Sequence, residues 1–121
     1  MAASGLSNIT EVKGDAIDIE VTLNTDITGW EIRVEVWDNQ DVPVFIRKAN
    51  NNVTGGDSSQ IEVTDALKGI FIIHIASGET TNMKGDVRIE VEVKNTAGQI
   101  RTIASNYLTL LEERINWTNV V

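Results

Sequence analysis

The sequence predicts an all-β fold, an immunoglobulin-like antiparallel β-sandwich of about seven strands. Apolar and polar residues alternate with period two over several stretches, which is typical of strands with one buried face. Polar turn residues separate these stretches at intervals of about 8–12 residues, the spacing of a sandwich. With 121 residues, the chain fits one domain that can bury a core of its own.

The first half of the chain contains the two clearest strands. Residues 1–10 are polar with isolated apolar groups, and we expect them to form an N-terminal arm before a sandwich domain at 11–111. Apolar residues occupy every second position over 17–23, and again from Trp30 to Val36 after a polar turn. Trp30 is the largest group on the face of its strand that we expect to be buried.

The middle of the chain is less regular. A third strand is predicted over 42–47, where Pro43 favours a strand start or a sheet edge because it lacks an N–H group. The stretch 50–59 is rich in asparagine, glycine and serine and is predicted to be a flexible loop. A short strand is expected at 61–63, and a turn follows it.

The most apolar run of the chain covers residues 70–75. Because both of its faces are largely apolar, we expect a strand that is covered on both sides. Residues 77–83 are predicted to form a single helical turn, with Ser77 as its N-terminal cap. The two faces of the strand carry Phe71, Ile73 and Ile75 on one side and Ile70, Ile72 and His74 on the other.

The last third of the chain reads as a long hairpin. Regular alternation predicts a strand over 87–93, and the polar residues at 95–98 predict a hairpin loop. The final strand is expected over 100–111, with a bend near 104–106. Residues 112–121 are then expected to form a C-terminal arm.

The composition argues against several classes of partner. The chain has no cysteine, so disulfides and thiolate metal sites are absent. Its net charge of −8, from 18 acidic and 10 basic residues, argues against a nucleic-acid surface, which needs clustered Lys and Arg. The longest apolar run is far shorter than the ~20 residues of a membrane span. We therefore predict no nucleic-acid partner and no membrane partner.

No set of residues indicates catalysis or a cofactor. His74 is the single histidine, and it reads either as a general base or metal ligand or as a strand histidine with satisfied hydrogen bonds. The second interpretation is favoured, because catalysis needs several convergent groups. The carboxylates of Glu31 and Glu35, and of Glu90 and Glu92, fall on the polar faces of strands. We predict a protein without enzymatic activity, cofactor or metal.

The tryptophans indicate a binding surface instead. Trp37 is out of phase with Trp30, and Trp117 lies in a tail too short to bury it. Exposed tryptophans are enriched in protein interfaces. The candidate interface residues are Trp37, Ile115, Trp117, Val120 and Val121.

Short motifs recur in order between Gly14 and Leu111. They are Gly14-Asp15 before the first clear strand, Asp26-Ile27-Thr28-Gly29 before Trp30, Gly69, Glu79-Thr80-Thr81-Asn82-Met83 with Gly85, and Gly98. In this order they resemble the immunoglobulin-like domain of phage baseplate upper proteins and related phage tail and fibre-adaptor domains. Val87 stands where that family usually has an aromatic residue.

The resemblance implies a structural protein of a phage virion, in the tail, baseplate or fibre-attachment region. It implies assembly with other virion proteins and with copies of itself, and production in the cytoplasm of the bacterial host. Two alternatives are a capsid decoration protein and a stand-alone carbohydrate-binding or adhesin-type sandwich module. A sugar site favours a row of surface aromatics, and the chain has only three Trp, one Tyr and two Phe.

Overall fold

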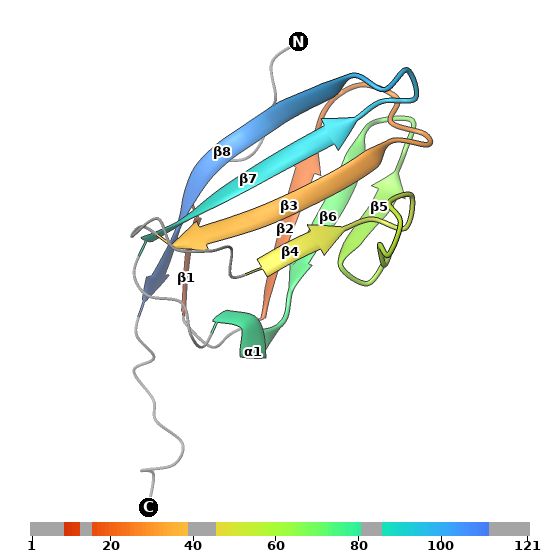
Figure 1. Ribbon diagram of the computed structural model, residues 1–121. Helices are drawn as coiled ribbons and strands as arrows, with labels where there is room; N and C mark the ends of the chain where they lie inside the picture. Colours follow the sequence, from red (N-terminus) through yellow and green to blue (C-terminus); the bar gives the residue numbers. More distant parts are fainter. Residues whose placement is uncertain (1–8, 13–15, 39–45, 81–85, 112–121) are drawn as a thin grey trace, which may run out of the picture.

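Two β-sheets pack face to face in the computed structural model, which confirms the all-β sandwich (Figure 1). The structure describes residues 9–12, 16–38, 46–80 and 86–111. This part of the chain contains strands β1 (Ile9–Val12), β2 (Ile17–Thr22), β3 (Glu31–Asp38), β4 (Ile46–Ala49), β5 (Ile61–Asp65), β6 (Ile70–Ile75), β7 (Asp86–Lys94) and β8 (Ile100–Leu111), and one helical turn, α1 (Ser77–Thr80).

The strand order is that of an immunoglobulin-like sandwich. The larger sheet has the order β1-β8-β7-β3-β4, and the smaller sheet has the order β2-β6-β5. If β2 to β8 are lettered B, C, C′, D, E, F and G, the sheets become GFCC′ and BED, as in that fold. All pairings are antiparallel except the one between β1 and β8, which is parallel.

The core lies between the two sheets and follows the alternation of the sequence. Every second residue of β2, β3 and β6 is buried, as are Ile89, Val91 and Val93 of β7, so each of these strands presents one apolar face to the other sheet. Phe71 is the largest fully buried side chain. The prediction that Trp30 is buried is only partly confirmed. Trp30 directly precedes β3, and its side chain packs against the core but is half-buried.

The prediction that the 70–75 strand is covered on both sides is wrong. Phe71, Ile73 and Ile75 are buried between the sheets, whereas Ile70, Ile72 and His74 point outward and are half-buried. The reason is that β6 is the central strand of the smaller sheet, and the described residues place no third layer over it. An apolar strip thus lies at the middle of an outer face.

The segments on either side of β4 also differ from expectation. The third strand runs over Ile46–Ala49, later than the predicted 42–47, and residues 39–45 lie outside the described residues. The predicted flexible loop at 50–59 is a series of tight turns that buries Asn50 and Val53, with 1% and 6% of their surface exposed. This loop therefore contributes to the interior of the sandwich.

The predicted ends and the helical turn need smaller corrections. Ile9 and Thr10, assigned to the N-terminal arm, belong to β1 and pair with β8, while residues 1–8 and 112–121 lie outside the described residues. The helical turn ends at Thr80 within the described residues, and the carboxylate of Glu79 accepts the N–H of Ala76 at 2.9 Å. The bend predicted near 104–106 corresponds to a register shift of β8 just before Ala104.

Candidate functional site

The outer face of the smaller sheet gathers charged and apolar side chains from three strands. We call Asp18, Glu20, Glu62, Ile70, Ile72 and His74 the BED face. The register sets Ile72 between Glu20 of β2 and Glu62 of β5, and it sets His74 opposite Asp18. The BED face therefore has an apolar strip along β6 with carboxylates on both sides.

His74 connects the three strands of this sheet. Its Nδ1 lies 2.8 Å from Asp18 Oδ1, and its Nε2 lies 3.2 Å from Glu62 Oε1. The hydrogen bond to Asp18 raises the pKa of His74 above its ordinary value of 6.5, partial burial opposes this, and the hydrogen bond to Glu62 raises the pKa further. Protonated His74 therefore offsets part of the negative charge of the BED face.

This geometry leaves His74 without a free ring nitrogen for chemistry. A metal ligand or a general base needs a lone pair that points at the metal or the substrate, and both ring nitrogens contact carboxylates instead. Within the ranges that the structure describes, no group of three or more His, Asp or Glu side chains is arranged to hold a metal ion. The cluster links β2, β6 and β5 across the outer face of the smaller sheet.

This cluster of His74 and two carboxylates makes a small part of the free energy of unfolding depend on pH. His74→Gln is expected to remove up to about 1 kcal/mol, because the carboxylates are largely exposed and the attraction is screened. The pKa of His74 is higher in the folded than in the unfolded protein, so the stabilisation is fully present below about pH 6.5 and is lost as the pH rises through the folded pKa. Urea unfolding at pH 6 and pH 9 measures this difference.

Two neighbouring variants separate the partners of His74. Asp18→Asn is expected to lower the pKa of His74 more than Glu62→Gln does, since the Asp18 hydrogen bond has the larger effect. The single imidazole signal in an NMR titration gives both values directly, because the chain has one histidine. Equal pKa values in wild type and Asp18→Asn would contradict the assignment.

Trp37 is the one candidate interface residue within the described part of the chain. It lies near the end of β3, opposite Arg88 of β7, and its side chain is half-buried. Its indole Nε1 is buried and has no hydrogen-bond partner among the residues that the structure describes. The other four candidates, Ile115, Trp117, Val120 and Val121, lie outside the described residues.

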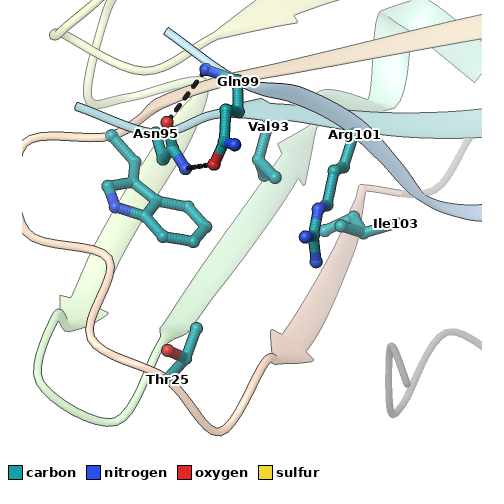
Figure 2. Close-up of a pocket in the computed structure, with 7 residues that line it drawn as sticks. Thr25, Val93, Asn95, Gln99, Arg101 and Ile103 are labelled. Atoms are coloured by element: carbon teal, nitrogen blue, oxygen red, sulfur yellow. Dashed lines mark hydrogen bonds between the residues drawn. The ribbon is translucent and has the colours of Figure 1, made fainter. Parts of the chain in front are cut away.

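A pocket at the end of the sandwich that carries the β7–β8 hairpin was not predicted from the sequence. It is a hollow of about 180 Å³ beside the β7–β8 hairpin, and Trp30, Val93 and Ile103 form its apolar wall. Thr25, Asn95, Gln99 and Arg101 supply its polar groups (Figure 2). Regular alternation indicated that Val93 faces inward, but only the pairing of β8 with β7 shows that Arg101 is opposite Val93.

Comparisons with known proteins give no basis for assigning a function, so the assignment rests on the sequence and the structure. No protein-family model matches the chain, and no curated protein matches it. The described residues include no helix with the length and apolar character of a membrane span. The fold defines the class of protein as an immunoglobulin-like β-sandwich, and the resemblance to phage tail domains stays a prediction.

Proposed function

We propose that this protein is a non-enzymatic structural component of a phage virion, in the tail, baseplate or fibre-attachment region. It acts through assembly with other virion proteins and with copies of itself. The proposal is supported by the immunoglobulin-like strand order, which the resemblance implied, and by the surface of the smaller sheet.

The BED face carries the proposal. Its central strand exposes parts of Ile70 and Ile72, and carboxylates flank this apolar strip on both sides. An apolar centre with a polar rim is the usual anatomy of a protein interface. Because the rim is acidic, the complementary surface carries lysine or arginine, and like-charged surfaces are rejected.

The size of this face favours an assembly with several contacts per copy. Strand spacing and rise give the three-stranded sheet an area of roughly 300 Å², whereas a stable two-protein interface takes about 800 Å² from each partner. A further contact is available at β5, which is the last strand of the smaller sheet, because the edge of a sheet can pair with another chain. A symmetric particle multiplies such small contacts.

The test is incorporation into particles. We expect mass spectrometry of gradient-purified virions from the host strain to detect the wild-type chain in amounts comparable to other tail proteins. Ile72→Lys replaces the apolar centre of the BED face with a positive charge, and we expect at least a tenfold loss from the particles because the change removes an apolar contact and repels a basic partner surface.

Thr102→Lys is the matched control. Thr102 is an exposed residue of β8 in the larger sheet, so the same change in charge falls away from the BED face. Both variants should unfold at a similar urea concentration, which separates assembly from folding. Absence of the wild-type chain from virions would overturn the proposed function, and equal incorporation of both variants would exclude the BED face.

A further inference from the structure

The pocket beside the β7–β8 hairpin presents mostly hydrogen-bond donors. Its polar groups come from Thr25, from the hairpin residues Asn95 and Gln99, and from Arg101 of β8. An amide side chain normally offers both a donor and an acceptor, whereas a guanidinium offers donors alone. The character of the pocket therefore depends on how the two amides are turned.

The backbone of the hairpin fixes both amide orientations. The N–H groups of Ala97 and Gln99 donate to Asn95 Oδ1 at 3.0 and 2.9 Å, and a backbone N–H can only donate. Asn95 Nδ2 is then the donor to Gln99 Oε1 at 2.9 Å (Figure 2). Both amide oxygens are thus engaged within the hairpin, and the Nε2 group of Gln99 is left to donate elsewhere.

Arg101 adds a positive charge to the pocket. Among the residues that the structure describes, no carboxylate lies within 4.0 Å of its guanidinium. Four other basic side chains do pair with carboxylates, in the ion pairs Arg47–Glu35, Lys48–Glu79, Arg88–Glu90 and Lys94–Glu31. In a chain with net charge −8, an arginine that lines a pocket and has no carboxylate partner in the described part of the chain is available to an anionic ligand.

We infer that this pocket binds a carboxylate carried on a small apolar group. A carboxylate accepts hydrogen bonds and does not donate, which matches Arg101 and the amide nitrogen of Gln99. The apolar part lies against Trp30, Val93 and Ile103. The volume of about 180 Å³ is close to that of the roughly 150 Å³ cavities that hold a benzene ring. The inference is independent of the proposed virion role.

A binding experiment with small acids tests the inference. The probe is 4-methylpentanoate, and its neutral isostere 4-methylpentanamide is the matched ligand; both are titrated into the labelled full-length protein and followed by NMR. We expect the acid to shift the signals of Gln99, Arg101 and Trp30, with at least tenfold tighter binding than the amide. Charge-assisted hydrogen bonds account for that ratio.

Two arginine variants separate the pocket from general charge. Arg101→Gln is expected to weaken binding of the acid at least tenfold and to leave binding of the amide nearly unchanged. Arg33→Gln removes the same charge from an exposed arginine on the outer face of β3 and should leave both affinities unchanged. Unchanged amide binding by Arg101→Gln shows that the pocket is still formed.

A second pair of probes identifies the source of the carboxylate. An acetylated and amidated peptide with a central glutamate between two leucines is compared with the same peptide containing glutamine. Tighter binding of the glutamate peptide than of the free acid supports a polypeptide ligand, and the reverse order supports a free organic acid. Three outcomes would overturn the inference. They are equal binding of the acid and the amide, no binding of the acid at concentrations up to about 50 mM, and an equal loss of affinity in both arginine variants.

Discussion

Asn50→Ala is expected to lower the free energy of unfolding by about 2–4 kcal/mol. The side chain of Asn50 accepts the N–H of Ile32 at 3.0 Å and donates to the carbonyl of Trp30 at 2.9 Å. Because Ile32 is fully buried, removal of Asn50 Oδ1 leaves the N–H of Ile32 without a partner and without water. Urea unfolding at pH 7 measures the loss.

Asn52→Ala is the matched control for this prediction. Asn52 is exposed and donates to the same carbonyl of Trp30 at 2.9 Å, so that oxygen keeps one partner in either variant. We expect Asn52→Ala to cost less than about 1 kcal/mol. If the two variants lose similar stability, the buried hydrogen bond to Ile32 does not have the role assigned to it.

The strands were predictable because their signal is local. Each buried strand face repeats every two residues, and this alternation follows directly from the geometry of a pleated strand in contact with a core. The same signal failed for the run 70–75, since an apolar residue at the centre of an exposed sheet face looks in sequence like a buried one. Whether another layer covers that face is decided by distant parts of the chain.

Asn50 shows the same limit for a polar residue. In sequence it starts a run of three asparagines, a composition typical of exposed loops. Its burial depends on hydrogen bonds to residues 18 and 20 positions earlier in the chain. Such long-range bonds need the register of β3 and β4, which alternation alone does not determine.

Less of the candidate site than of the fold could be predicted from the sequence. The sequence favoured a strand histidine with satisfied hydrogen bonds for His74, and the structure gives both of its ring nitrogens a carboxylate partner. The partners themselves, Asp18 and Glu62, come from two other strands and required the pairing of β2, β5 and β6. The Arg101 pocket required the pairing of β7 with β8 and the amide orientations of the hairpin.

Gly56→Ala is expected to be strongly destabilising, with a loss of about 3–5 kcal/mol in the free energy of unfolding. A Cβ atom at position 56 would lie 1.7 Å from the carbonyl oxygen of Asn50 and 2.8 Å from that of Val53. Backbone atoms cannot move aside as a flexible side chain does. The turn would have to open, which breaks the 2.7 Å hydrogen bond from the Gly56 N–H to the Val53 carbonyl.

The neighbouring glycine provides the control, because the two positions differ in the kind of cost. Gly55 has a φ angle of 80°, and a Cβ atom there would meet nothing within 4 Å. Gly55→Ala therefore carries only the conformational cost of a left-handed residue, about 1–2 kcal/mol. Urea unfolding of both variants should rank Gly56→Ala as clearly less stable. The reverse rank would mean that the turn tolerates a side chain at position 56, and that the Asn50 carbonyl is not held where the structure places it.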